Sequence, residues 1–357
     1  MKKKYWETTQ IDKTEAEYRI PIGERGNGKS YAVKKKSLLL ALQNNEEFIY
    51  LRRFREDIKT VYVERYFADM DIKKLTHGVY DGIYVYHGEI YYCNYNDDGK
   101  AINKKLIGHA CALSEDERLK SQQFPDVTNI IYEEFVSKRM YLPDEPNRLQ
   151  NFVSTVARDR QIAVWMIGNK MTRVCPYFQE WGLTNIPKQK IDTIEVYRLK
   201  SYDDDGNEKI TRVAVENCGS AGSKSTMFFG KSASAIKNGE WETDSYPKFP
   251  SGDIKDYTML YELMLSDLGF DFVLQLYVQN ETGGMFVYVY PYTRNRIIKR
   301  KITNIFSPDP LTTSTFNDNI NAERIIRDCL QKSKTCYSDN LTGTDFNQVL
   351  KSRKGLL

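Results

Sequence analysis

The chain has 357 residues, of which 41% are hydrophobic and 28% charged, with a net charge of +4 and a pI near 8.5. This composition is ordinary for a globular protein of roughly two domains, and the mild positive charge permits a nucleic-acid partner without requiring one. Because no apolar run approaches a membrane span, the N-terminus lacks a signal-peptide core and the six cysteines are scattered, we expect a soluble intracellular protein with reduced thiols.

The first motif in the chain is the segment GERGNGKS, Gly23 to Ser30, which matches the pattern G-x-x-x-x-G-K-[ST], the Walker A motif or P-loop. In this pattern a glycine-rich backbone surrounds the phosphates of a nucleotide, the lysine reaches the β- and γ-phosphates, and the hydroxyl ligates Mg²⁺. Residues 17–23 (EYRIPIG) alternate like a strand, and Tyr31 to Leu42 has the apolar spacing of a helix, so both flanks suit a phosphate loop. The other interpretation is a glycine-rich turn that happens to end in Lys-Ser.

We therefore expect ATP and Mg²⁺ at this loop, with Ser30 as a metal ligand. The predicted nucleotide-binding residues are Gly23, Glu24, Arg25, Gly26, Asn27, Gly28, Lys29, Ser30 and Tyr31.

After the loop helix, residues 46–59 (EEFIYLRRFREDIK) are typical of a strand followed by a charged helix start. Residues 79–113 predict two or three antiparallel strands with turns at HGE and NDDGK. Three histidines fall in or near this region, but strand spacing and the lack of a cysteine or carboxylate pattern speak against a metal site there. These histidines are His77, His87 and His109.

A second part of the site is predicted by residues 127–135 (VTNIIYEEF), an apolar strand that ends in Glu133 and Glu134. In a motor ATPase the first acid supports Mg²⁺ through its water shell and the second polarises the attacking water. The usual first acid is aspartate, and Glu133 is one methylene longer. Two carboxylates that simply face solvent at a strand end are the alternative.

A helix around residues 143–157 leads to residues 161–169 (QIAVWMIGN), a third apolar strand that ends in Asn169. If this strand lies between the loop strand and the EEF strand, Asn169 can orient the attacking water or sense the γ-phosphate; otherwise it is a turn former. Arg158 and Arg160 precede the strand and lie some 25 Å from its far end, at roughly 3.3 Å per residue. We expect one of them to serve the nucleotide of a neighbouring subunit, as an arginine finger, with a surface salt bridge as the alternative.

The predicted fold class is α/β. Apolar strands separated by helices favour a parallel sheet covered on both faces, which we assign to an ATPase domain over residues 1–200. Residues 201–252 have the composition of a linker or lid, although KITRVAVE within them could form a strand. A smaller second domain is expected over residues 253–357, where FDFVLQLYVQNETGGMFVYVYPY predicts a hairpin with a glycine turn.

Several of these segments, in this order and approximate spacing, resemble one family. They are GERGNGKSYA, EFIYLRRFRED, VTNIIYEEF, VARDRQ and IGNKMTRVCPYF. The family is that of the DNA-packaging (encapsidation) ATPases of small, protein-primed tailed phages of the phi29 type, which belong to the additional-strand, catalytic-glutamate class of P-loop proteins. The resemblance covers roughly residues 17–180 and fades beyond residue 200.

The resemblance implies a homomeric ring motor, pentameric in the family, that pumps double-stranded DNA into a prohead. Its implied partners are DNA, further copies of the chain, the portal of the prohead and, in one reading, a structural packaging RNA. Its implied location is the host cytoplasm, at the portal vertex. It favours Arg158 as the finger over Arg160, and a second domain that resembles an RNase H-like nuclease without its catalytic residues. The segment FVLQLYVQ fits this last point, because it carries no carboxylate in its middle, and Asp271 lies only at its start.

The candidate DNA contacts are basic residues that phosphates would attract. The resemblance places a basic residue that faces the pore at the position of Arg55, so Arg55 and Lys59 rank above the hairpin lysines Lys104 and Lys105. Arg52 and Arg53 are closer to the nucleotide and fit a coupling role. The segment RNRIIKRK, residues 294–301, suits DNA, the portal or RNA, and a solvated basic surface is the alternative for each cluster.

Two other functions use the same motifs. A helicase or remodelling ATPase would need the same catalytic residues, whereas an assembly adaptor would bind ATP without motor activity.

Overall fold

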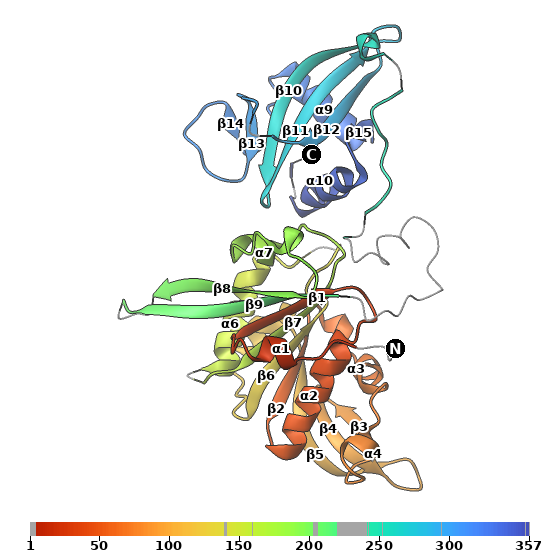
Figure 1. Ribbon diagram of the computed structural model, residues 1–357, viewed down its shortest axis with the longest axis vertical. Helices are drawn as coiled ribbons and strands as arrows, with labels where there is room; N and C mark the ends of the chain where they lie inside the picture. The colour runs from red at the N-terminus through yellow and green to blue at the C-terminus, as the bar shows by residue number, and fades with distance from the viewer. Residues whose placement is uncertain are drawn as a thin grey trace.

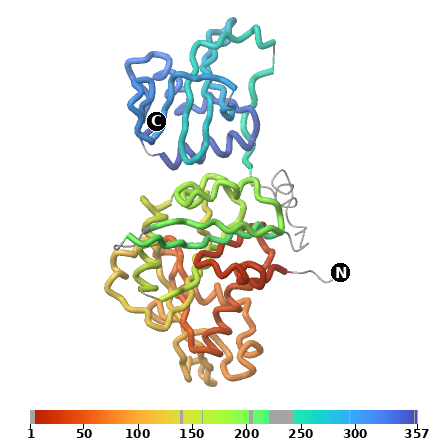
Figure 2. The backbone as a smooth tube through the Cα atoms, turned by 60° about the vertical axis from the view of Figure 1, so that its left-hand side comes forward, coloured from red at the N-terminus to blue at the C-terminus, as the bar shows by residue number. Residues whose placement is uncertain are grey.

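The computed structural model describes residues 5–138, 141–158, 160–202, 206–219, 241, 243–251, 253–293, 295–353 and 355–356. These residues form two domains that lie end to end along the long axis of the molecule (Figures 1 and 2). No helix among them is long and apolar enough to cross a membrane.

The first domain is built on a mixed sheet, of which nine strands lie in the described residues. In spatial order these are β3 (Gly82–Tyr86), β4 (Glu89–Tyr95), β5 (Ala101–Ala112), β2 (Glu47–Arg52), β6 (Val127–Glu133), β7 (Ala163–Asn169), β1 (Tyr18–Gly23), β9 (Glu208–Cys218) and β8 (Thr193–Tyr202). The strands from β5 to β9 are parallel, and the pairs at the two edges are antiparallel. The predicted parallel sheet is thus confirmed for its centre, and the β3–β4–β5 meander agrees with the predicted antiparallel strands.

Helices cover both faces of this sheet, as unbroken apolar strands require. On one face lie α1 (Thr9–Asp12), α2 (Lys29–Gln43), α3 (Thr60–Phe67) and α4 (Ile72–Leu75), and on the other lie α5 (Asp116–Leu119), α6 (Glu145–Ala157) and α7 (Pro176–Glu180). Strand β7 shows the division, because Trp165 packs with the α2 side and Val164 and Met166 with the α6 side. Short 3-10 turns are η1 (Arg55–Ile58), η2 (Leu113–Glu115) and η3 (Ile186–Lys188).

The role expected of Asn169 required its strand to lie between the loop strand and the strand that ends in Glu133, and the strand order meets this requirement. Strand β7 lies between β1 and β6, and its register pairs Gly23 with Asn169 and Glu133 with Ile167. The end of the loop strand, the acids and Asn169 therefore share one edge of the sheet.

The predicted boundary at residue 200 was wrong. Strand β9 lies inside the expected linker, and it pairs in parallel with β1 along Tyr18 to Gly23. Its Val213 and Val215 are fully buried in the core on the α6 side. The first sheet thus continues to Cys218, and most of the remaining expected linker lies outside the described residues.

The second domain is a mixed sheet with helices packed on one face. Its strands in spatial order are β14 (Thr312–Thr313), β13 (Lys301–Thr303), β10 (Tyr257–Asp267), β11 (Phe270–Gln279), β12 (Met285–Pro291) and β15 (Thr335–Tyr337), and its helices are η4 (Ile254–Asp256), α9 (Asn321–Gln331) and α10 (Asn340–Ser352). The predicted hairpin is confirmed as β11 and β12.

One carboxylate in the middle of this sheet was overlooked in the sequence. Strand β10 is as central as β11 and carries Glu262, which forms an ion pair with Arg296 at 2.6 Å and accepts a hydrogen bond from Gln275 at 3.1 Å. Its charge is therefore already compensated by an arginine.

The two domains touch through the segment that follows β7. Val174 is buried in the core of the second domain, and Arg173 forms an ion pair with Asp345 of α10. The end of the strand that carries Asn169 is thus only a few residues from the second domain.

Candidate nucleotide site

The phosphate loop connects β1 to α2 by way of backbone conformations that favour glycine. Gly26 and Gly28 have φ values of 75° and 94°, in the left-handed region that a side chain disfavours. At Gly23 a Cβ would lie 2.4 Å from the Cys218 carbonyl oxygen of β9, so a larger residue cannot fit. Gly28 is the N-cap of the 15-residue helix α2, whose first backbone N–H groups are oriented toward the loop.

The ammonium of Lys29 lies at the centre of this loop. It donates hydrogen bonds to the Glu24 carbonyl oxygen at 2.7 Å, to Asn27 Oδ1 at 3.0 Å and to Asn169 Oδ1 at 3.3 Å. Burial lowers the pKa of Lys29 to about 8, against the opposing influence of nearby acids such as Glu133. A buried cation held by neutral oxygens is suited to receive an anion.

The side chain of Glu133 is buried beside the loop. Its carboxylate accepts a hydrogen bond from Tyr66 OH at 2.9 Å, and the Ser30 hydroxyl lies close to it. Burial raises the pKa of Glu133, although the neighbouring Ser30 and Tyr66 hydroxyls oppose the rise. The structure thus brings Ser30 and Glu133 together, as the two motifs predict.

Glu134 differs from Glu133 in conformation and exposure. Its φ of 58° is left-handed, which is uncommon for a residue other than glycine, and its backbone N–H donates to the Ile167 carbonyl oxygen at 3.0 Å. Its side chain is 61% exposed and forms an ion pair with Arg52, with 2.8 Å between Arg52 Nη2 and Glu134 Oε2. The remaining loop residues Arg25 and Tyr31 are exposed.

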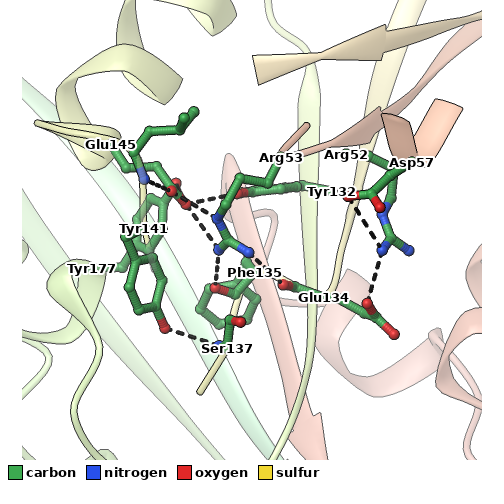
Figure 3. Close-up of polar contacts among 11 residues, drawn as sticks. Arg52, Arg53, Asp57, Tyr132, Glu134, Phe135, Ser137, Tyr141, Glu145 and Tyr177 are labelled. Carbon is green, nitrogen blue, oxygen red and sulfur yellow. Dashed lines mark hydrogen bonds and ion pairs between the residues drawn. The ribbon is translucent and has the colours of Figure 1, made fainter. Parts of the chain in front are cut away.

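Next to Glu134 lies a buried polar cluster that sequence reasoning missed (Figure 3). Its centre is the ion pair of Arg53 and Glu145, whose side chains are 7% and 0% exposed. Glu145 also accepts hydrogen bonds from Tyr132 OH at 2.7 Å, from Tyr177 OH at 3.0 Å and from the Leu142 backbone N–H at 2.8 Å. A buried acid at the first residue of α6 gave no signal in the sequence, because a glutamate is almost never fully buried unless it is paired.

The two candidate fingers have different surroundings. The guanidinium of Arg160 donates to four backbone carbonyl oxygens, those of Pro125 at 2.6 Å, Phe124 at 2.7 Å, Val127 at 2.8 Å and Val156 at 2.8 Å. Arg158 is the C-cap of α6 and is exposed. Both precede β7 and lie at the sheet edge opposite the phosphate loop.

Among the candidate DNA contacts, some side chains are exposed and others are already bound to groups of the protein. Arg55 and Lys59 are exposed and line a groove of about 1130 Å³, where the Arg55 guanidinium lies 3.4 Å from Glu115. Lys105 donates to the Ala41 carbonyl oxygen at 2.8 Å and to Asn45 Oδ1 at 2.7 Å, so its ammonium is bound at the C-terminal end of α2.

Lys104 lies over the ring of Tyr84, with its ammonium 4.0 Å from the ring centre. Both lysines belong to strand β5 of the β4–β5 hairpin, in agreement with the prediction. In the second domain, Arg296 and Arg300 of the basic segment form ion pairs with Glu262 and Glu323, and Arg294 lies outside the described residues.

Comparison with known proteins places the chain among phage packaging proteins. Residues 1–213 match the family model described as Podovirus DNA encapsidation protein (Gp16). The DNA packaging protein of Bacillus phage B103 is 33% identical over 168 residues, which are 45% of this chain and 47% of that protein. The DNA packaging protein of Bacillus phage phi29 is 32% identical over 166 residues, 45% of each chain. These matches span about half the length of the curated relatives.

Two solved structures share the fold over both domains. A chain of the bacteriophage Phi-29 viral genome packaging motor assembly has a TM-score of 0.55 and 20% identity, with 98% of this chain and 99% of that chain covered. A chain of the Phi-28 gp11 DNA packaging motor has a TM-score of 0.50 and 15% identity, with 98% of both chains covered. At these identities the likeness concerns the fold alone.

Proposed function

This chain belongs to the podovirus DNA encapsidation protein family, and from that premise we propose that it is an ATPase whose hydrolysis drives double-stranded viral DNA into a prohead. The observation that carries the proposal is the contact of Lys29 with Asn169, next to the contact of Ser30 with Glu133. Three parallel strands deliver these four residues to one edge of the sheet, which is the arrangement that a nucleotide-hydrolysing site needs.

The residues at this edge fit ATP and Mg²⁺. Mg²⁺ is usually bound by one or two carboxylates together with substrate phosphates and water, and Ser30 and Glu133 would supply the protein's share. Lys29, with its ammonium among neutral oxygens, would pair with the β- and γ-phosphates. When bound, the metal supplies neutralisation of phosphate charge.

The remaining residues fit the roles of hydrolysis. Glu134 accepts a proton from the attacking water, while the γ-phosphoryl group passes to the water oxygen and ADP leaves. Asn169, within reach of Lys29, orients the water or senses the γ-phosphate. Arg158 is the finger that serves a neighbouring subunit's nucleotide. Both arginines are exposed, but the four carbonyl contacts of Arg160 favour a structural role for that residue.

The rest of the proposal concerns the assembly. The chain acts as a homomeric ring, which we expect to be a pentamer, docked on the portal of the prohead in the host cytoplasm, and a structural packaging RNA is a further candidate partner. Arg55 and Lys59 contact the DNA backbone. The second domain is RNase H-like without nuclease activity; the pairing of Glu262 with Arg296 supports this, since a metal-dependent nuclease needs free carboxylates there.

One experiment separates this function from its alternatives. Empty proheads are incubated with the protein, DNA and ATP, and the DNA is then tested for protection from nuclease. Protected DNA supports the packaging motor. Hydrolysis that duplex DNA stimulates, with strand separation of a forked duplex and no protection, would favour a helicase or remodelling ATPase. ATP binding without turnover in the presence or absence of DNA would favour an assembly adaptor.

A further inference from the structure

The buried pair of Arg53 and Glu145 faces the backbone of Glu134 rather than its side chain. Arg53 Nη2 donates to the Phe135 carbonyl oxygen at 2.7 Å, and Arg53 Nη1 lies 3.4 Å from the Glu134 carbonyl oxygen. The same guanidinium holds Glu145 with two bonds, Nε to Oε2 at 2.7 Å and Nη2 to Oε1 at 3.0 Å (Figure 3). The planar guanidinium of Arg53 thus bonds at once to two consecutive backbone carbonyl groups and to the Glu145 carboxylate.

These carbonyl groups belong to a left-handed residue, Glu134, and to the residue after it. Glu134 has a φ of 58°, and a side-chain-bearing residue in that region persists only where its surroundings fix it. Its N–H is held by the Ile167 carbonyl oxygen, and its own carbonyl and the next one are held by Arg53. The direction in which the Glu134 side chain leaves the backbone therefore depends on Arg53.

Glu145 in turn fixes Arg53. The carboxylate is fully buried and accepts bonds from two tyrosine hydroxyls and one backbone N–H besides the arginine. Burial alone would lower the pKa of Arg53, but Tyr132 and Glu145 outweigh it and hold that pKa above its usual range. Because the buried Glu145 carboxylate is bonded on every side, it holds the Arg53 guanidinium in one position.

We propose that Arg53 and Glu145 are positioning residues for hydrolysis, which fix the left-handed turn at Glu134 and thereby aim its carboxylate at the attacking water. This inference rests on the proposed function, in which Glu134 is the proton acceptor. Arg53 contacts the carbonyl oxygens of Glu134 and Phe135, so we expect the effect of the pair on hydrolysis to pass through Glu134.

The test compares Glu145→Gln with a matched control in the full chain. Glu323→Gln is the control, because the Arg300–Glu323 pair in the second domain has the same side-chain exposures, 7% and 0%, and the same two-bond geometry. Glu145→Gln should lower kcat at least about tenfold while KM for ATP stays within about twofold, since a misplaced catalytic group costs rate rather than binding. Glu323→Gln should lower the unfolding midpoint by a similar amount and leave kcat unchanged.

A double-mutant cycle shows whether the effect passes through Glu134. In a Glu134→Gln background the further change Glu145→Gln should alter the residual single-turnover rate by less than about twofold. Should Glu145→Gln not fold, Arg53→Lys is tested in the same way, because an ammonium keeps the charge but lacks the planar fork of donors.

A wild-type kcat in the folded variant would overturn the inference, as would an equal loss of rate in both backgrounds. If Glu134→Gln itself leaves hydrolysis intact, Glu134 is not the proton acceptor, and the assignment on which this inference rests fails while the proposed ATPase activity stands. If Glu134→Gln blocks hydrolysis and Glu145→Gln does not, only the positioning role fails.

Discussion

The carboxylate of Glu134 lies 2.8 Å from the guanidinium of Arg52, so the proposed proton acceptor is engaged by a cation from the neighbouring region of the sheet. Because Arg52 ends β2 and Arg55 follows it by three residues, the same short segment contacts the proposed proton acceptor and carries a candidate DNA contact. The Arg52–Glu134 pair therefore links the groove proposed to bind DNA to the proposed site of hydrolysis.

The first prediction follows from this pair. The ion pair holds the Glu134 carboxylate against Arg52, so Arg52→Ala should free it for the attacking water, raise the rate of ATP hydrolysis without DNA and reduce its stimulation by DNA. A partly exposed pair is worth at most about 1 kcal/mol, which limits the rise to roughly fivefold. Steady-state hydrolysis with and without duplex DNA measures both effects. A lower basal rate in the variant would show that Arg52 assists catalysis instead.

The second prediction separates nucleotide binding from chemistry. Lys29→Ala removes the ammonium that would engage the γ-phosphate and should lower turnover on the order of 100-fold or more. Glu134→Gln keeps the shape of the site but loses the proton acceptor, so ATP should stay bound while turnover falls by a factor on the order of 100 to 10,000. Filter binding of labelled ATP and phosphate release give the two quantities. Normal turnover in Glu134→Gln would remove that residue from the mechanism.

Much of this site was predictable because its chemistry is local. The loop Gly23–Ser30 and the strand ends at Glu133 and Asn169 are contiguous patterns, and parallel strands bring such ends together at one edge. The strand that KITRVAVE was expected to be able to form is confirmed as β9, but it was placed in the linker. Its pairing with β1 is a contact across almost two hundred residues, and the glycine-, serine- and acid-rich segments around it dominated the composition.

The cluster at Glu145 was missed for the same physical reason. It gathers Arg53, Tyr132 and Tyr177 from three separate elements, and no short pattern records that their side chains meet. The sequence also ranked Lys105 as a DNA contact, although its ammonium is bound at the end of α2. The sequence shows where lysines and arginines occur, but it does not show which of them are already bound to other groups in the folded protein.

The third prediction concerns pH. In the free protein burial lowers the pKa of Lys29 to about 8, and bound phosphates would raise it again. Below pH 8 the ammonium is charged in both states, so affinity for nucleotide should be constant. As pH rises through about 8 the free protein loses the proton that binding requires, and affinity should fall by up to about tenfold per pH unit.

Nucleotide titrations between about pH 6.5 and about pH 9.5 test this, because the interval spans the shifted pKa. Lys29→Arg is the control, since a guanidinium stays charged throughout and its affinity should not change over this interval. An affinity of the wild-type protein that is equally insensitive to pH would contradict a lysine titrating near 8.

The fourth prediction concerns the grip on DNA. Neutralising Arg55 and Lys59 together should weaken binding to all duplex sequences alike and lower the slope of log affinity against log salt by about two units, at about 0.9 per lost phosphate contact. Lys105→Ala should lower stability and leave the salt slope unchanged, because Lys105 is bound to Ala41 and Asn45. An unchanged slope in the double variant would move the contact to Lys104 or to the second domain.

The last prediction concerns the ring. Arg158 is exposed at the sheet edge opposite the phosphate loop, so we expect it to serve a neighbour's nucleotide and not its own. Arg158→Ala and Lys29→Ala subunits should each be inactive alone, yet mixed rings should regain part of the hydrolysis wherever an intact arginine meets an intact loop. Arg160→Ala serves as the contrast: losing its carbonyl contacts should cost about 1–3 kcal/mol of stability, measured by denaturant unfolding, and its mixtures should show no such rescue. Mixed rings of confirmed composition without any regained activity would eliminate Arg158 as a finger acting between subunits, and the need for a ring in hydrolysis would then require separate evidence.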